Sequence, residues 1–272
     1  MKRIFFIFFV LAFTAAGISA QEKQSPVDYF NSRLRQMGRG QRDRRGGRSR
    51  RLITHGPDNV ALVRPDASAQ SGRDRVTNDR PIINFEGDLV ALGPIRRDLL
   101  MTYQRWINDF EVVRTLALYP SPITEEAELQ WYEAGATSKD QPSFTIYERS
   151  SMRPIGNTSL QVIDWVHRRA EWGIAIGEAD ARGKGYGTET ARLMLDYAFT
   201  ALGLNSVSLH VYEYNIPARK AYTRAGFVES GRMRQARWYA GRFWDVILMD
   251  CLASEFESPV LHKIFAPDIE RP

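Results

Sequence analysis

A short glycine-rich stretch of the chain has the residue types and the spacing to bind an anion through its backbone. It reads Arg182-Gly183-Lys184-Gly185-Tyr186-Gly187 and joins a predicted strand, Trp172 to Gly177, to a periodic helix expected from near Thr188. Glycines at alternate positions allow successive N–H groups to turn toward one point, and the helix adds unpaired N–H groups and its positive dipole end. The stretch therefore predicts a cradle for a pyrophosphate.

Two familiar phosphate motifs fit this stretch poorly. A Walker loop needs Gly-Lys followed directly by Ser or Thr, whereas Lys184 is followed by Gly185. A Rossmann fingerprint needs G-x-G-x-x-G and an acidic residue about 20 residues further on. Here the glycines are spaced G-x-G-x-G, and the first acidic residue beyond the next predicted strand, Glu213, lies too far away.

The spacing R-x-x-G-x-G, read as Arg182, Gly185 and Gly187, resembles the GNAT superfamily of acyl-CoA-dependent N-acetyltransferases. A second segment, Asn215 to Phe227, is similar to that family's N-x-x-A-x-x-x-Y-x-x-x-G-F pattern. The end of the chain, through Gly231–Ala236 and Gly241–Met249, is similar to the final hairpin of the branch that acetylates ribosomal-protein N-termini and related amines. The resemblance covers Phe85 to Leu252.

The resemblance implies an α/β fold with a mixed, mostly antiparallel central sheet flanked by helices. It also implies acetyl-CoA as co-substrate, attacked directly by an amine in a ternary complex. The backbone of the cradle would hold the pyrophosphate, with charge from Arg182 or Lys184, and the pantetheine arm would pair with the preceding strand where the sheet splays. The expected cofactor contacts are Ile174, Ala175, Ile176, Arg182, Gly183, Lys184, Gly185, Tyr186, Gly187, Thr188, Asn215 and Lys220.

Tyr222 is the expected general acid, because the family's pattern places this hydroxyl at the thioester sulfur, where it protonates the departing thiolate. Its alternative interpretation is a core aromatic, since it shares a helical stripe with Ala218 and Ala225. Asn215 is expected to cap the helix that carries Tyr222 and also to bind the cofactor.

Glu171 is the expected general base. An alkylamine with a pKa near 10 is mostly protonated at pH 7, and removing its proton costs about 4 kcal/mol. Glu171 opens the strand that would pair with pantetheine, although it could instead form a salt bridge with Arg168 or Arg169. A water chain could replace a carboxylate base, and an N-terminal α-amine would need less help.

The acceptor is a primary amine whose identity the sequence leaves open between a protein N-terminus, a small amine, an aminoglycoside-like antibiotic and an amino sugar. A set of aromatic residues predicts an aromatic-rich cleft, or otherwise core packing: Trp106, Trp131, Tyr132, Trp165, Trp172, Trp238 and Tyr239. The four histidines show no metal spacing, His210 is expected to pack beside Val211, and Cys251 is poorly placed for a nucleophile. A different class also remains open, a non-catalytic acyl-CoA sensor.

Charge divides the chain of 272 residues. Residues 1–80 contain 16 Lys and Arg against 7 Asp and Glu, a net of +9, so the total of +5 leaves −4 for residues 81–272. The predicted organisation is an apolar signal-like or anchor segment over 1–20, a basic disordered linker over 21–80, the acetyltransferase domain over 81–254 and a loose tail over 255–272. The arginines of 33–51 could bind an anionic membrane or RNA weakly.

The signals for location disagree. Met1 to Ala20 has the pattern of an export signal, but the arginines that follow oppose translocation, and acetyl-CoA is a cytosolic metabolite. We expect a cytoplasmic catalytic domain, and three origins of the N-terminus stay open: an anchor, true export, or translation that starts near Met37. The oligomeric state cannot be read from the sequence.

Periodicity places the elements between the motifs. The expected elements are a strand over Gly87–Ile95, a helix capped by Asp98, a helix from Thr124, strands over Ser143–Glu148, Pro154–Trp165 and Ala170–Gly177, a helix ended by Gly203, a strand through Val207, Leu209 and Val211, a helix from Asn215 to Gly226, and a hairpin of Phe227–Ala236 with Phe243–Cys251.

Overall fold

An eight-stranded sheet forms the centre of the part of the chain that the computed structural model describes, residues 80–118 and 120–269. Its strand order is β1-β2-β3-β4-β5-β6-β8-β7, and each neighbouring pair is antiparallel except β5 and β6. The strands are β1 Phe85–Glu86, β2 Val90–Pro94, β3 Ser143–Glu148, β4 Arg153–Asp164, β5 Arg169–Ile176, β6 Ser206–Tyr212, β7 Val228–Tyr239 and β8 Arg242–Leu252. The mixed, mostly antiparallel sheet predicted from the sequence is confirmed.

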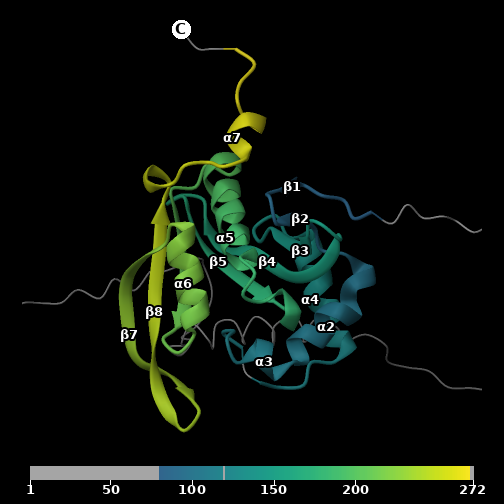
Figure 1. Ribbon diagram of the computed structural model, residues 1–272, viewed down its shortest axis with the longest axis vertical. Helices are drawn as coiled ribbons and strands as arrows, with labels where there is room; N and C mark the ends of the chain where they lie inside the picture. Colours follow the sequence, from purple (N-terminus) through teal and green to yellow (C-terminus); the bar gives the residue numbers. More distant parts are fainter. Residues whose placement is uncertain (1–79, 119, 270–272) are drawn as a thin grey trace, which may run out of the picture. The chain divides into compact units, whose positions relative to one another are not determined.

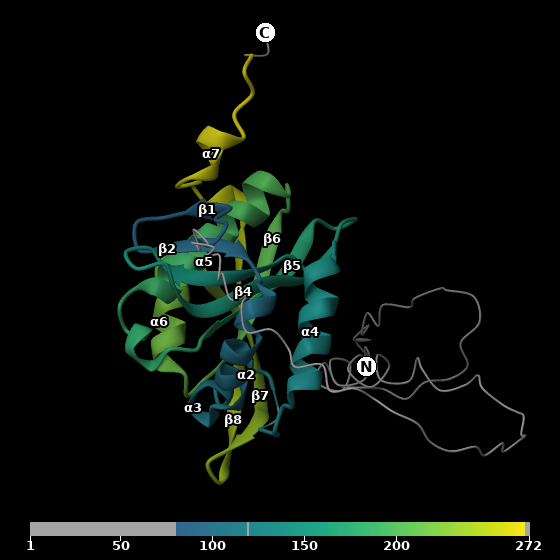
Figure 2. The same ribbon diagram turned by 90° about the vertical axis from the view of Figure 1, so that its right-hand side faces the viewer.

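Helices cover both faces of this sheet. Figures 1 and 2 show α5 and α6 on one side of the sheet and α2 and α4 on the other. The α-helices are α2 Leu100–Asn108, α3 Phe110–Val113, α4 Glu125–Thr137, α5 Tyr186–Asp196, α6 Ile216–Ala225 and α7 Leu261–Ile264. Helix α5 continues as a π-helix over Tyr197–Ala201 and connects the two parallel strands β5 and β6.

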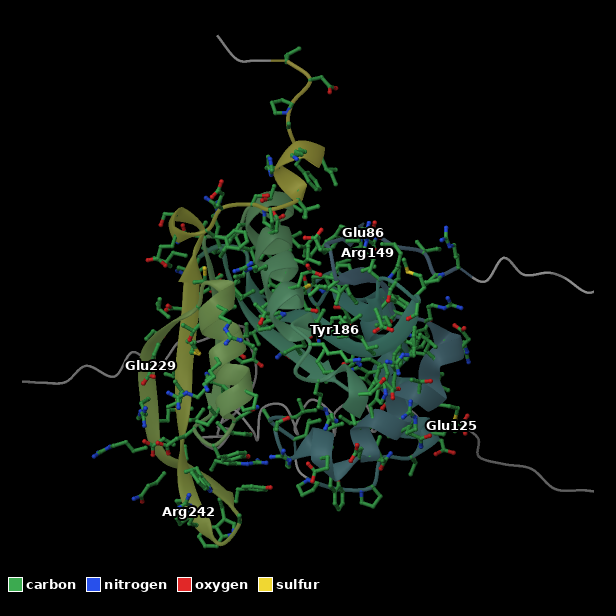
Figure 3. The ribbon with its side chains drawn as sticks, viewed as in Figure 1. Glu86, Glu125, Arg149, Tyr186, Glu229 and Arg242 are labelled. Atoms are coloured by element: carbon green, nitrogen blue, oxygen red, sulfur yellow. The ribbon has the colours of Figure 1, made fainter. Side chains whose placement is uncertain are left out.

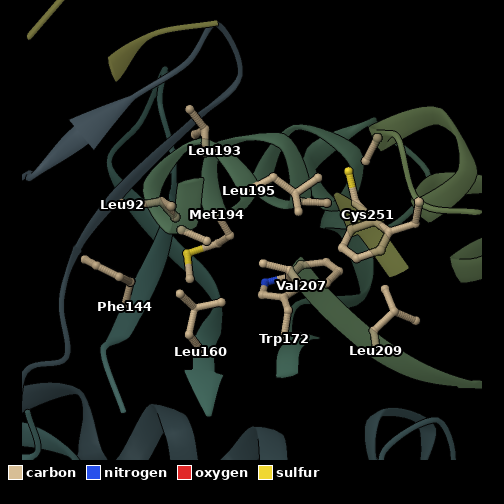
Figure 4. Close-up of a cluster of buried hydrophobic side chains, with 14 of the residues drawn as sticks. Leu92, Phe144, Leu160, Trp172, Leu193, Met194, Leu195, Val207, Leu209 and Cys251 are labelled. Atoms are coloured by element: carbon tan, nitrogen blue, oxygen red, sulfur yellow. The ribbon is translucent and has the colours of Figure 1, made fainter. Parts of the chain in front are cut away.

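The main core lies between the sheet and helices α5 and α6. Helix α5 buries Ala191, Met194 and Leu195, and its π-helical continuation buries Ala198 on the same face. The facing strands contribute alternate side chains, such as Leu160, Trp172, Val207 and Leu209, which Figure 4 shows packed with α5. A smaller cluster on the opposite face joins α2 to α4 through Tyr103, Trp106 and Trp131.

The start of the domain differs from the sequence-based expectation in two places. The predicted strand over Gly87–Ile95 is a short hairpin, because β1 and β2 pair across a turn at Gly87 to Leu89. Asp98 does not cap a helix; it lies inside a 3₁₀ turn and bonds the Arg96 side chain.

Part of the segment expected to be a loose tail is packed against the core. The Asp196 carboxylate, at the end of α5, is completely buried and accepts hydrogen bonds from the backbone N–H groups of Val260 and Leu261 at 2.9 and 2.8 Å. It also accepts from the hydroxyl groups of Ser258 and Thr200. This buried carboxylate satisfies four donors, and it fixes the chain just before α7 beside α5 (Figure 1).

We expect Asp196→Asn to lower the free energy of unfolding by about 2 kcal/mol, because an amide N–H₂ would face donors that now share a carboxylate. Urea unfolding of the full chain, followed by tryptophan fluorescence, measures the change. Asp268→Asn makes the same substitution at an exposed position and is expected to stay within about 0.5 kcal/mol of the wild type. Equal midpoints for both variants would contradict this role for Asp196.

Several sequence-based expectations lie outside the described residues. These are the signal-like segment over 1–20, the basic linker up to residue 79 and the membrane or RNA contact through 33–51. Within the described ranges, no helix has both the length and the apolar character needed to cross a membrane.

Candidate active site

The two parallel strands of the sheet diverge, and the gap between them is the centre of the candidate site. Strand β5 pairs with β6 at only three positions, the last of which joins Glu171 to Ser208. Beyond this point β5 continues to Ile176 paired only with β4, while β6 continues to Tyr212 paired only with β8. The splay that the family resemblance implied is therefore present.

The edge of β5 that faces the gap contains the expected pantetheine segment, Ile174, Ala175 and Ile176. Its backbone has no strand partner on that side, so an extended chain could add there by main-chain hydrogen bonds. The Arg182 guanidinium lies 3.4 Å from both the Ile176 and the Gly177 carbonyl oxygens. Arg182 thus fixes the glycine loop to the end of β5, a role that sequence reasoning did not assign to it.

The glycine loop presents a run of unpaired backbone donors. No described residue accepts a hydrogen bond from the N–H groups of residues 183–187, which lie at and just before the start of α5. Gly183 and Gly185 have φ of 77° and 90°, a region that favours glycine. Gly187 has no such φ, and a side chain there would enter open space. The fold itself does not require glycine at this position, whereas close approach of a ligand to the backbone would.

The side chains of the loop play different parts. Lys184 is exposed and has no ion pair among the described residues. Its ammonium group can therefore add positive charge beside the backbone N–H groups that would bind an anion. Tyr186 instead points back to the sheet, where its hydroxyl donates to Glu148 at 2.6 Å (Figure 3 labels Tyr186). The helix begins at Tyr186, two residues earlier than expected, so Thr188 lies in its first turn.

Glu189 is a residue of this region that sequence reasoning missed. Its carboxylate accepts hydrogen bonds from the backbone N–H groups of Asp88, Leu89 and Val90, at 3.0, 2.7 and 2.6 Å. The β1–β2 turn is therefore fixed to the first turn of α5, and the Leu89 side chain lies close to Gly185. No local sequence pattern signals a contact between residues about 100 positions apart.

Tyr222 lies on α6 and packs against the main core. Its ring packs edge-on against Trp172 of β5 and against Phe227, with centroids 5.3 and 6.3 Å apart. Burial raises the pKa of Tyr222 above its ordinary value, so the hydroxyl is protonated at neutral pH. No described residue forms a hydrogen bond with this hydroxyl. The ring therefore packs as a core aromatic residue. The hydroxyl has no partner among the described residues, so the role of general acid stays open to it.

Asn215 and Lys220 lie on the same helix as Tyr222. The Asn215 side chain accepts from the Ala218 N–H at 3.4 Å, which confirms the predicted cap, and Gly226 ends α6 with φ of 115°. Lys220 is exposed near the middle of α6. Their contacts with a cofactor remain predictions.

Glu171 lies at the point where the strands diverge, on the face of β5 opposite Trp172. It forms no ion pair with its neighbours: Arg169 pairs with Asp164 at 3.4 Å, and Arg168 donates to the Gly203 carbonyl. The alternative of a salt bridge with either arginine is therefore not observed. Glu171 remains a candidate base.

His210 is placed differently from the sequence-based expectation. It does not pack beside Val211, because Val207, Leu209 and Val211 turn into the main core while His210 is exposed on the opposite face of β6. The alternation of Val207, Leu209 and Val211 along the strand already places His210 on the opposite face. His210 thus lies on the same face as Ser208 and Glu171, one step further along the splayed strand.

The aromatic residues expected to line one cleft fall into separate groups. Trp106, Trp131 and Tyr132 belong to the α2–α4 cluster, and Trp172 belongs to the main core. Trp165 and Trp238 are exposed. Tyr239 packs at the end of β6 with three aromatic residues that the sequence analysis did not single out, Tyr212, Tyr214 and Trp244.

Cys251 is buried in the main core (Figure 4), and burial raises the pKa of its thiol to about 11. The structure thus agrees with the expectation that it is not a nucleophile.

Glu128 of α4 is a second buried carboxyl group, only 6% exposed, and burial raises its pKa to about 7. Because the folded pKa exceeds the ordinary value of 4.5, the group's contribution to stability is complete below pH 4.5 and is lost as pH rises through about 7. We expect the free energy of unfolding of the wild type to fall across this window relative to Glu128→Gln, by up to about 1.4 kcal/mol per pH unit. Chemical unfolding at several pH values checks this, and parallel profiles for the two proteins would contradict it.

Comparison with known proteins agrees with this geometry. A family model described as an acetyltransferase (GNAT) domain matches residues 90–228, just over half of the 272 residues. The chain belongs to this family. The predicted enzyme class, an acyl-CoA-dependent N-acetyltransferase that uses acetyl-CoA, is thereby confirmed, whereas the branch that acetylates ribosomal-protein N-termini is not singled out.

Several relatives are enzymes that act on small amines. The spermidine N(1)-acetyltransferase of Vibrio cholerae is 35% identical over 111 residues, which cover 41% of this chain and 64% of that enzyme, just under two thirds. The Escherichia coli K12 spermidine N(1)-acetyltransferase is 30% identical over 168 residues, covering 59% of this chain and 84% of that enzyme. The crystal structure of the V. cholerae spermidine N-acetyltransferase with CoA and spermine is similar with a TM-score of 0.58 and 27% identity, covering 62% of this chain and 98% of that one.

Proposed function

We propose that this acetyltransferase transfers the acetyl group of acetyl-CoA to the primary amine of a small molecule, by direct attack within a ternary complex. The observation that carries the proposal is the gap between β5 and β6, with the unpaired amides of residues 183–187 at one end and Glu171 at its apex. The amides would hold the diphosphate, and the free edge of β5 would hold the pantetheine arm.

The residues at the apex supply the two proton transfers that the reaction needs. Glu171, or a water that it orients, accepts the proton of the ammonium group so that a neutral amine attacks the thioester carbonyl. Tyr222 donates its proton to the departing thiolate, and burial keeps this hydroxyl protonated until that step. The two residues lie on opposite faces of β5, so amine and thioester would meet from opposite sides of the sheet.

Small amines are favoured as acceptors because the relatives named above are spermidine acetyltransferases. A peptide N-terminus and amine-bearing antibiotics or amino sugars remain within the same chemistry. The non-catalytic acyl-CoA sensor gains no support, since those relatives are named as enzymes.

An acceptor screen tests the proposal. The full chain is incubated with acetyl-CoA and one amine at a time, chosen from alkylamines, diamines, ω-amino acids, amino sugars, aminoglycosides and short peptides, and released thiol is followed. We expect amine-dependent thiol release with at least one small amine. Tight binding of acetyl-CoA with no release from any of these classes would contradict the proposal.

A further inference from the structure

Arg237 is turned inward by an irregularity in β7. Most side chains of this strand are exposed, but Arg237 is half-buried. Between the pairs Met233 with Val246 and Arg237 with Trp244, three residues of β7 oppose one residue of β8. At the centre of this bulge Gln235 has a φ of 53°, and its N–H donates to the Asp245 carboxylate at 2.8 Å. Bulges of this kind redirect side chains and are common beside active sites.

Among residues 80–118 and 120–269, no carboxylate forms an ion pair with the guanidinium of Arg237. This guanidinium lies 4.6 Å from the centre of the Tyr212 ring and contacts the Tyr214 hydroxyl. Its Nε is buried and has no hydrogen-bond partner among the described residues, where Arg237 also forms no ion pair. Two nearby carboxylates, Glu213 and Asp245, are already paired with Arg232 at 3.1 and 3.2 Å.

The Tyr212 ring places this arginine beside the splayed end of β6. Tyr212 is the last residue of that strand and shares a face with Ser208 and His210, opposite the valines and leucine of the core. Its hydroxyl donates to the Leu116 carbonyl, so the segment after α3 lies next to this end of β6. Arg237 therefore borders the face from which the amine would approach.

A buried N–H group without a hydrogen-bond partner is unfavourable, and a half-buried cation without an anion adds to this cost. A planar guanidinium is suited to bind the two oxygens of a carboxylate. We propose that Arg237 binds a carboxylate of the acceptor, so that the preferred substrates are primary amines that carry a carboxylate at the far end of the molecule. The inference rests on the proposed function and specifies its substrate class.

The spacing along β6 sets the size of such a substrate. Ser208, at the apex, and Tyr212, beneath the guanidinium, are four residues apart, which corresponds to roughly 13 Å in a strand. An α-amino acid is too short to reach from one to the other. An ω-amino acid of about eight carbons has a suitable length. A polyamine would bring a second ammonium group toward Arg237, which is unfavourable.

Three acceptors of equal chain length separate these possibilities: 8-aminooctanoate, 1,8-diaminooctane and octylamine. We expect the full-length wild type to have a higher kcat/KM for 8-aminooctanoate than for the other two. In Arg237→Gln, the ratio of kcat/KM for 8-aminooctanoate to that for octylamine should fall by about 30-fold or more, mainly through KM. Arg237→Lys keeps the charge but not the planar fork, so the ratio should fall less.

Arg234→Gln is the matched control, because it removes an exposed arginine from the same strand and should leave the ratio unchanged. If Arg237→Gln does not fold, the smaller change expected in Arg237→Lys decides the question. Turnover with an unchanged ratio in the Arg237 variants, or a wild-type preference for the diamine, would overturn the inference while leaving the proposed function intact. No thiol release with any amine would instead contradict the proposed function, and the inference with it.

Discussion

Tyr222→Phe is expected to lower kcat by about 10²- to 10⁴-fold, the usual contribution of a positioned general acid. The substitution removes one oxygen and leaves the ring, so the edge-on packing with Trp172 and Phe227 is kept. The KM for acetyl-CoA should change little, because the proposed cofactor contacts are backbone groups elsewhere. Steady-state thiol release with the best amine of the acceptor screen measures both quantities.

Tyr197→Phe provides the control for this substitution. Tyr197 is also half-buried with a pKa raised by burial, but it lies in the π-helix after α5 and packs on Phe85 and Phe144. We expect its kcat to remain within about threefold of the wild type, as for a substitution that touches no reacting group. A kcat in Tyr222→Phe equal to that of the control would show that water or another group protonates the thiolate.

Gly187→Leu is expected to move stability and cofactor affinity in opposite directions. A Cβ at this position has no protein atom within 4 Å, and leucine is a better helix former than glycine by about 0.8 kcal/mol, so the free energy of unfolding should rise slightly. The same side chain would cover the N–H groups at the start of α5. We therefore expect the Kd for acetyl-CoA to rise by about 100-fold or more, equivalent to about 2.7 kcal/mol.

Two further variants are expected to weaken acetyl-CoA binding by smaller amounts. Gly187→Ala should give a smaller loss of affinity with a similar gain in stability, because a methyl group covers less of the cradle. Lys184→Ala removes one exposed charge and should weaken binding by about 1 kcal/mol or less, more at low salt than at high salt. If Gly187→Leu binds acetyl-CoA as tightly as the wild type, the start of α5 is not the diphosphate site.

The features that the sequence predicted correctly depend on local patterns. Glycines with positive φ, the Asn215 cap and the alternation of Val207, Leu209 and Val211 are set by a residue and its near neighbours. The splay of β5 and β6 is of another kind, because only the family resemblance implied it. His210 was predicted wrongly, although the same alternation assigns it to the exposed face of β6.

The features that the sequence did not predict depend on contacts between distant segments. The Glu189 carboxylate holds a turn about 100 residues earlier, and the Asp196 carboxylate holds the chain more than 60 residues later. Asp245 of the neighbouring strand accepts a hydrogen bond from Gln235 in the bulge, and the bulge shifts the register just before Arg237. Such contacts depend on the tertiary structure, and no local sequence pattern indicates them.

Calorimetric titration of the full chain with acetyl-CoA and with S-acetylpantetheine tests the central claim most directly, because the second compound carries the same thioester arm without the diphosphate. We predict that acetyl-CoA binds about 100-fold more tightly than S-acetylpantetheine, and that Gly187→Leu removes most of this difference. Equal affinities for the two compounds, or no heat of binding at saturating acetyl-CoA, would contradict the claim that the amides of residues 183–187 hold the diphosphate.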